Sequence, residues 1–173
     1  IARPEKFIYL GSGACYGRQP ADMKAIPEEY PGAPDAAEPN SALGIGKRTA
    51  EFFCRYFGEK HQLDVSIARC FSFYGPFLPL DIHYAVGNFV ADGLAGREIR
   101  VAGDGTAIRS YLYVADLIVL LLAILARGRA LEAYNAGSDQ EVSIRELAEQ
   151  VGSYFGQPVV VAGSPPGGAP NRY

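Results

Sequence analysis

The sequence lacks any run of basic residues longer than Lys47-Arg48, and its 173 residues carry a formal net charge of −3. Proteins that bind nucleic acids do so largely through Lys and Arg side chains that face the phosphates. The charge pattern therefore gives no support to a nucleic-acid partner, and we expect none.

Cysteine is scarce as well. Cys15, Cys54 and Cys70 are an odd number of thiols, and their spacing is not that of a metal site. Each lies in a segment that we predict to be a strand or a helix. We therefore expect buried thiols in a reducing compartment, no metal, and a cytoplasmic protein.

A long hydrophobic run is also missing. The longest, Leu117 to Ala126, has about half of the ~20 residues that a membrane span needs, so we predict a buried helix and no membrane partner. Charged residues near the N-terminus precede a strand rather than the apolar core of a signal peptide. The chain has no initiator methionine and begins almost at once with that strand, so we expect a piece of a longer protein.

The remaining composition, 49% hydrophobic and 20% charged, is typical of one globular domain or of part of a larger one. Strands and helices are predicted in alternation, which favours an α/β fold with a parallel sheet and right-handed crossovers. Gly17 to Pro39 is predicted to be a long surface loop. The predicted strands are 7–10, 65–70, 99–102, 133–136 and 159–161, and the predicted helices are 41–60, 82–94, 117–126 and 144–155.

Three polar residues are expected to cap predicted helices. Ser41 and Asp116 each stand before an apolar helical segment, and Ser143 does so with Glu146 three residues later, which is the pattern of a capping box. Ligands in such folds bind beyond the carboxyl ends of the strands. Ser12, Phe71 to Pro76 and Asn135 to Ser138 follow strand ends, and we expect one shared cleft there.

Four segments in a fixed order then carry a resemblance to a known family. Together they resemble the extended short-chain dehydrogenase/reductases, and within them the NAD-dependent sugar-nucleotide epimerase/dehydratase group. The segments are Tyr9-Leu-Gly-Ser12-Gly-Ala-Cys-Tyr16-Gly17, Pro39-x3-Leu43-x3-Lys47-x3-Glu51, Ala68-Arg69-Cys-Phe71-x2-Tyr74-Gly-Pro76 and Gly103-Asp-Gly105-x3-Arg109-Ser-Tyr111-x-Tyr113-Val-x-Asp116.

The resemblance implies a fold class and a division of the chain. It implies the second half of a Rossmann-like parallel sheet with an interleaved small α/β substrate-binding region. Residues 1–76 would be the second half of the NAD(P)-binding domain. Residues 77–173 would mainly bind nucleotide sugar, with 114–137 returning to the sheet. The Gly-rich dinucleotide motif of the family is not found in this sequence.

The resemblance also implies a site built on Ser/Thr plus Tyr-x3-Lys, with NAD (or NADP) as cofactor. Ser12 matches the serine that binds the reacting oxygen, although it could simply close the turn after the strand. Lys47 matches the lysine that lowers the pKa of the tyrosine and binds the nicotinamide ribose, although it could be an ordinary surface lysine. Leu43 stands where the tyrosine belongs.

An alkyl side chain can neither donate nor accept a proton, so Leu43 cannot perform general acid–base catalysis. We predict that it is an ordinary core leucine at helical spacing. Three explanations stay open: an inactivating change, a proton supplied by another group, or binding without turnover. Candidates for another group are Tyr16, Tyr74, Tyr84 and His83. Gly13-Ala14 also lacks the acidic pair of the hexose 4,6-dehydratases, so an elimination step has little support.

Further binding residues follow from the resemblance. Arg109, and less directly Arg172, would hold the nucleotide diphosphate, since a guanidinium can bind two phosphate oxygens at once. Asn88 would contact the nucleotide. Phe71 and Ser72 would bring backbone to the nicotinamide amide, with the Phe71 side chain predicted to be a buried aromatic.

The sequence thus predicts an NAD(P)-dependent nucleotide-sugar epimerase/dehydratase-type enzyme that acts by transient hydride transfer at a sugar carbon. The alternative is a catalytically impaired relative that binds nucleotide sugar or cofactor without turnover. A third hypothesis, a steroid or flavonoid substrate, is disfavoured by Arg109. The helix at 41–60 has apolar residues on more than one side, including Phe52 and Tyr56, and in relatives this helix pairs with its copy. We therefore predict a homodimer for the full-length protein.

Overall fold

The computed structural model describes residues 4–82, 84–164 and 170–173. Its central feature is a parallel sheet with the strand order β1-β2-β6, formed by Lys6–Ser12, Asp64–Cys70 and Ala133–Ala136. The predicted α/β class with a parallel sheet is therefore confirmed. The carboxyl ends of β1 and β2 lie side by side, with Ser12 opposite Cys70.

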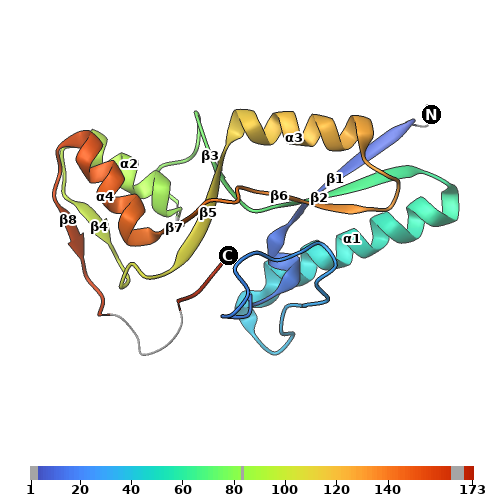
Figure 1. The fold of residues 1–173 in the computed structure, drawn as a ribbon, viewed down its shortest axis with the longest axis horizontal. Helices are drawn as coiled ribbons and strands as arrows, with labels where there is room; N and C mark the ends of the chain where they lie inside the picture. Colours follow the sequence, from blue (N-terminus) through green and yellow to red (C-terminus); the bar gives the residue numbers. More distant parts are fainter. Residues whose placement is uncertain (1–3, 83, 165–169) are drawn as a thin grey trace.

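Two helices cover this sheet, one on each face (Figure 1). The first, α1 (Ala42–His61), connects β1 to β2, and the second, α3 (Val114–Arg127), precedes β6. Apolar side chains of α3 and of the strands are removed from water together, and such burial contributes about 25 cal/mol per Å² of apolar surface. The buried residues of this core are Ala68, Leu117, Ile124 and Ala136.

A second group of elements lies at the other end of the long axis (Figure 1). There β4 (Ile99–Val101) pairs in parallel with β8 (Val159–Val161), and α2 (Ala85–Leu94) and α4 (Ile144–Phe155) pack together beside them. This group has its own core. Its buried residues are Phe89, Ile99, Val101 and Ala148.

Three strands between these groups were not predicted. They are β3 (Ser72–Tyr74), β5 (Ile108–Tyr113) and β7 (Glu141–Ser143), and β5 pairs in parallel with β3 and antiparallel with β7. Strands of three residues, such as β3 and β7, are too short to show a period-two pattern. The strand β5 carries Arg109, which was predicted to hold the nucleotide diphosphate.

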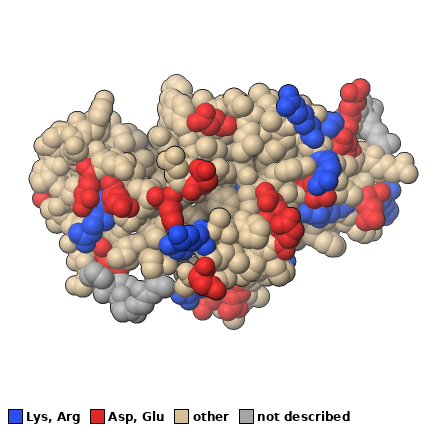
Figure 2. All heavy atoms as spheres, viewed as in Figure 1, with Lys and Arg blue, Asp and Glu red and all other residues tan. Residues whose placement is uncertain are grey.

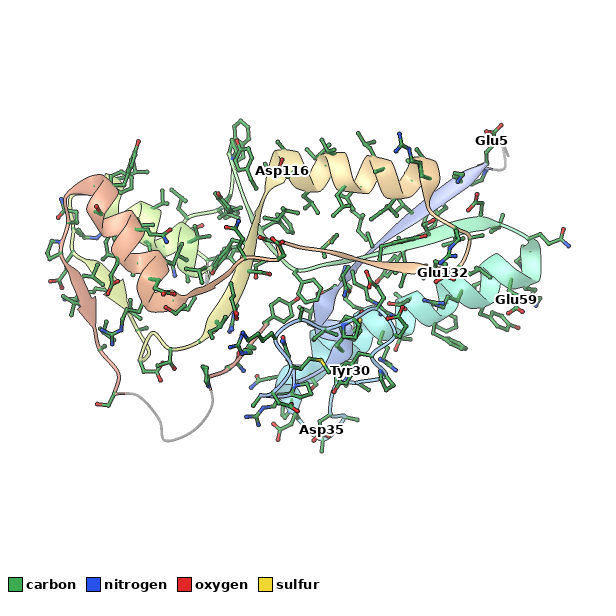
Figure 3. The ribbon with its side chains drawn as sticks, in the orientation of Figure 1. Glu5, Tyr30, Asp35, Glu59, Asp116 and Glu132 are labelled. Atoms are coloured by element: carbon green, nitrogen blue, oxygen red, sulfur yellow. The ribbon has the colours of Figure 1, made fainter. Side chains whose placement is uncertain are left out.

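The three predicted helix caps have different outcomes in the structure. Ser143 forms the predicted capping box: its side chain accepts from the Glu146 amide, and the Glu146 carboxylate accepts from the Ser143 amide. Ser41 occupies the N-cap position of α1, as predicted, but it also ends a short 3-10 helix, η2 (Pro39–Ser41), and its side chain makes no capping hydrogen bond. Asp116 is wrong as a cap, since it lies within the first turn of α3 (Figure 3). At that position its negative charge still interacts favourably with the helix dipole.

The apolar helix α3 is buried along one side only. Leu117 and Ile124 are buried, whereas Ile118, Val119 and Leu122 are more than half exposed, so the prediction of a fully buried helix was wrong. In the described part of the chain, no helix is long and apolar enough to cross a membrane.

Charges of both signs are interspersed on the face of the molecule in Figure 2.

The three thiols differ in exposure: Cys15 is buried, whereas Cys54 and Cys70 are partly exposed. Burial raises the pKa of all three. Within the described ranges, no group of His, Cys, Asp and Glu could hold a metal ion.

Candidate active site

Ser12 is the last residue of β1 and makes two contacts. Its Oγ accepts from the Ala14 amide at 3.2 Å, which caps the one-turn 3-10 helix η1 (Gly13–Tyr16). The same Oγ lies 3.1 Å from the hydroxyl of Tyr173. Ser12 therefore closes the turn after the strand and also presents its hydroxyl toward a phenol.

Lys47 lies on α1 and reaches back to the same strand. Its ammonium donates to the Leu10 carbonyl at 3.0 Å and lies 5.7 Å from the centre of the Tyr9 ring. It forms no ion pair with any carboxylate in the part of the chain that the structure describes. An ammonium has three donors, so Lys47 can bind a hydroxyl group while it keeps its bond to Leu10.

Leu43 is not a core residue. Its side chain is 63% exposed, and the prediction of an ordinary core leucine was wrong. It lines a cavity of about 860 Å³ whose wall also includes Ala14, Arg109 and Tyr173. The first turn of α1 extends beyond the sheet, so helical spacing there does not imply contact with the core. Position 43 thus faces the space where a ligand could bind.

The four groups considered as substitute proton donors are in different places. Tyr16 is only 1% exposed, and its hydroxyl donates to Asn135 at 2.9 Å while it accepts from Arg69 at 2.6 Å. Tyr74 lies on β3, and Tyr84 precedes α2; neither lines the cavity beside Leu43. His83 lies outside the described residues. Of these groups, Tyr16 is already engaged in a buried network, because its hydroxyl makes both of the hydrogen bonds given above.

Arg109 lies where two cavities meet. It lines the cavity beside Leu43 and a second one of about 370 Å³ that follows the carboxyl ends of β2 and β6. Its Nη1 donates only to backbone, to Ile108 O at 2.7 Å and Asn171 O at 3.3 Å. Burial lowers the pKa of this guanidinium. A partly buried cation without a carboxylate partner among the described residues favours an anionic ligand.

Arg172 lines both cavities as well, but its charge is paired. Its Nη1 forms an ion pair with Glu141 of β7. The backbone around it is fixed on β5, because Ile108 N donates to Asn171 O at 2.8 Å and Tyr173 N donates to Ile108 O at 3.1 Å. The C-terminal residues thus lie between the two cavities, beside Arg109.

Tyr173 was not among the predicted site residues. Its hydroxyl is next to Ser12, its ring is 5.5 Å from that of Phe71, and it lines both cavities. Burial raises the pKa of its phenol. No local pattern could have identified it, because 161 residues separate it from Ser12 and no predicted element includes it.

The other predicted binding residues, Phe71, Ser72 and Asn88, do not all lie at the two cavities. The Phe71 side chain is partly buried and lies 6.5 Å from the Tyr16 ring, while its amide donates to Ala136 O at 2.9 Å. Ser72 begins β3 and lines neither cavity. Asn88 is exposed on α2, and the amide orientation that satisfies its hydrogen bonds, assigned from its surroundings, lets its nitrogen donate to two carbonyls of the preceding loop at 2.8 and 3.1 Å. The structure therefore brings Leu43, Arg109 and Arg172 together around the larger cavity and Phe71 to the smaller one, while Ser12 adjoins them only through Tyr173. Lys47, Ser72 and Asn88 line neither cavity.

Comparison with known proteins gives a family match over most of the chain. The NAD-dependent epimerase/dehydratase family matches residues 1–137. UDP-glucuronic acid decarboxylase 3 of Arabidopsis thaliana is 34% identical over 125 residues, which are 72% of this chain and 36% of that protein. The chain thus matches a little over a third of the length of this relative.

Solved structures show the same fold. The dTDP-glucose 4,6-dehydratase of Bacillus anthracis in complex with NAD has a TM-score of 0.81 at 26% identity, covering 97% of this chain and 51% of that one. The UDP-glucose 4-epimerase of Thermotoga maritima with UDP-glucose has a TM-score of 0.81 at 25% identity, covering 97% of this chain and 53% of that one. The predicted Rossmann-like class is confirmed.

Proposed function

The chain belongs to the NAD-dependent epimerase/dehydratase family, and we propose that it is part of an enzyme that converts a nucleotide-diphosphate sugar by transient hydride transfer at a sugar carbon. One observation carries this proposal. Arg109, a partly buried cation without a carboxylate partner in the described ranges, lines both cavities beside the Ser12–Tyr173 pair.

The chemistry of Arg109 suits a diphosphate. A planar guanidinium can donate two parallel hydrogen bonds to phosphate oxygens, and partial burial strengthens such bonds. Arg172 contributes further donors, although it shares its charge with Glu141. The sugar would then extend toward Ser12 and Leu43, since the cavity that Arg109 lines continues to that side. Asn88 and Ser72 would take part only if the elements that carry them move.

The residues at the end of β1 fit a nicotinamide cofactor, NAD or NADP. When bound, such a cofactor accepts a hydride from a carbon and later returns it. Lys47 would bind the ribose hydroxyls with donors that its bond to Leu10 leaves available. Phe71 and Ser72 would approach the nicotinamide amide with backbone, although the Phe71 amide already donates to Ala136.

The site has no acid–base group at the position where the family would transfer the proton of the reacting oxygen. Ser12 would donate to or accept from that oxygen, and Lys47 would supply positive charge nearby. Leu43 supplies no proton, so an impaired relative that binds nucleotide sugar or cofactor without turnover is the second candidate function. This alternative is favoured by the exposure of Leu43 within the cavity, where the family places a phenol.

We further propose the division expected from the sequence. Residues 1–76 would form the second half of the NAD(P)-binding domain, and 77–173 would mainly bind nucleotide sugar, with 114–137 returning to the sheet. The contacts of α3 with β1, β2 and β6 support that return. We propose a cytoplasmic location on the basis of the free cysteines.

A homodimer through α1 is proposed for the full-length protein. Phe52, Phe53, Tyr56 and Phe57 are each between 45% and 60% exposed and stack on one another along one side of that helix. A second copy would remove these rings from water. Sedimentation of the full-length protein should give a dimer for wild type and a monomer for Phe52→Glu/Tyr56→Glu. A dimer that survives both substitutions would contradict this interface.

The function itself is tested with the full-length protein, NAD and a panel of UDP-glucose, UDP-glucuronic acid and dTDP-glucose. Calorimetry measures binding, and hydride exchange at the sugar measures turnover. Binding with turnover that is lost in Ser12→Ala supports the enzyme and shows that another group supplies the proton. Binding without turnover supports the impaired relative. If neither a nucleotide sugar nor NAD binds, both proposals are wrong.

A further inference from the structure

The loop before α1 forms one wall of both cavities. Residues 17–38, all within the described part of the chain, contain no helix or strand. Lys24 to Ile26 line the smaller cavity, and Arg18 and Pro34 line the larger one. The position of this loop therefore decides the shape of the space in which a ligand would lie.

Three hydrogen bonds attach the loop to the ends of β2 and β6. Asn135 donates its side-chain amide to Ile26 O at 2.7 Å and its backbone amide to Glu28 Oε1 at 3.0 Å. Arg69 donates Nη1 to Glu28 O at 3.0 Å. The donors belong to β-strands. The acceptors belong to the loop, at Ile26, which lines the smaller cavity, and at Glu28, two residues further on.

Arg69 is held in place by Glu51 of α1. Both carboxylate oxygens of Glu51 accept from Arg69, at 2.9 and 2.6 Å, and the two residues are only 7% and 9% exposed. Burial lowers the pKa of Arg69, but the hydrogen bonds with Glu51 and Tyr16 outweigh it and raise that pKa. Tyr16 completes the network, since it accepts from Arg69 and donates to Asn135.

We propose that Glu51, Arg69 and Asn135 are positioning residues, which fix the 17–38 loop against the strand ends and thereby set the affinity of the cleft for nucleotide sugar. The inference rests on the proposed function for the identity of the ligand, but not for the position of the loop. None of the three is a catalytic residue. Glu51 and Arg69 line neither cavity, so their effect would pass through the loop.

Stability alone does not account for this arrangement. A buried ion pair is often no more stabilising than apolar residues of similar volume, whereas removal of one partner is strongly destabilising. The double variant Glu51→Leu/Arg69→Met therefore separates the two roles. It leaves no unpaired buried charge, and it removes the donor to Glu28 O.

Limited trypsin digestion of the full-length protein tests the loop directly, because Arg18 and Lys24 are cleavage sites within it. We expect cleavage there to become about tenfold faster in the double variant, since proteolysis follows the population of the open form. Arg55→Ala is the matched control. Arg55 also pairs with Glu51, at 3.4 Å, but it lies on the outer side and contacts no loop residue that the structure records.

Binding gives the second measurement. We expect the Kd for a nucleotide sugar that binds wild type to rise about tenfold in the double variant, because a wall that is no longer preorganised must be ordered on binding. The Arg55→Ala control should bind like wild type. In a protein with turnover, KM should rise while kcat changes little.

Asn135→Asp covers the case in which the double variant does not fold. Aspartate keeps the acceptor for Tyr16, loses the donor to Ile26 O and adds a negative charge near the Glu28 carboxylate, so both changes should loosen the loop. It should show the same faster cleavage with a smaller change. Unchanged cleavage at Arg18 and Lys24 in the folded variants would overturn the proposal, whatever the ligand. Faster cleavage with unchanged affinity would overturn the link to binding. If wild type binds no nucleotide sugar while cleavage is faster, the proposed function fails and the loop anchor stands.

Discussion

The two walls of the cleft differ in what they offer a ligand. The anion wall, on β5 and the C-terminal residues, consists of Arg109, Arg172 and Tyr173, and it presents two guanidinium groups. The proton wall, on β1 and α1, consists of Leu43, which lines the larger cavity, together with Ser12 and Lys47, which line neither cavity; Ser12 contacts Tyr173, and Lys47 follows Leu43 by one helical turn. It presents an alkyl group where the resemblance to the family predicts a phenol. Under the proposed function, recognition and proton transfer would be carried by different elements, so that one could be lost without the other.

Two arginines, Arg69 and Arg109, differ in whether their charge is already paired within the fold. Arg69 is buried, and Glu51 accepts from it with both oxygens. Arg109 is partly buried and donates only to backbone carbonyls among the residues that the structure describes. The first charge is already neutralised within the fold. The second is still able to bind phosphate, and this supports the diphosphate-binding role that we propose for the anion wall.

The largest effect is expected from Leu43→Tyr, which would complete the proton wall. A phenol at this position would lie in the cavity beside Lys47, whose charge would favour the phenolate. In the full-length protein with NAD we expect turnover of nucleotide sugar to rise by about 10²–10⁴-fold, the usual contribution of general acid–base catalysis. Hydride exchange at the sugar measures it.

Leu43→Phe is the matched control for this variant. It adds the same ring without the hydroxyl, so it should stay at the level of wild type. Equal rates for Leu43→Tyr and Leu43→Phe would show that the missing phenol is not what limits the proton wall.

A smaller effect is expected on the anion wall. Arg109→Ala removes hydrogen bonds to a charged group, each worth about 1.5–3 kcal/mol, so the Kd for a nucleotide sugar should rise about 10- to 100-fold. Calorimetry with the full-length protein measures this. Arg100→Ala is the control, because Arg100 is exposed on β4 and pairs with Glu98 at 2.6 Å. If the two variants weaken binding equally, Arg109 has no special role in the anion wall.

The sequence predicted the elements that have strong periodicity and missed those that depend on tertiary contacts. The strands β1, β2 and β6 and the capping box of Ser143 are local features, and they were found. The strands β3 and β7 have three residues each and are stabilised by their pairing with β5. Ser41 stands at the predicted N-cap position, but no local pattern indicates the 3-10 turn before α1, in which its side chain makes no capping hydrogen bond.

The candidate site shows the same limit. Ser12, Lys47 and Arg109 could be proposed from the sequence because each lies in a recognisable segment, and their roles stay predictions. Tyr173 could not, because its place beside Ser12 is fixed by the bridge between Ile108 and Arg172. Leu43 was assigned to the core from helical spacing, which gives the side of a helix but not what that side faces. Only the three-dimensional arrangement shows that it faces the cavity.

The smallest effect concerns Tyr173, where the two walls meet. Burial raises the pKa of its phenol above the ordinary value of about 10. The stabilisation linked to this shift is fully present below pH ~10 and is lost as the pH rises through the higher folded-state pKa, because the unfolded chain loses the proton first. Phenylalanine has no proton to lose. The free energy of unfolding of Tyr173→Phe should therefore fall less between pH ~9 and ~11 than that of wild type.

Urea unfolding at several pH values in this range measures the difference. Burial also raises the pKa of Tyr9, Tyr16 and Tyr111, so the alkaline loss of stability should be reduced and not abolished. Tyr154→Phe is the matched control, since its side chain is 84% exposed on α4. The same alkaline slope in both variants would mean that the Tyr173 phenol is not enclosed beside Ser12, and the contact that joins the two walls would then be absent in solution.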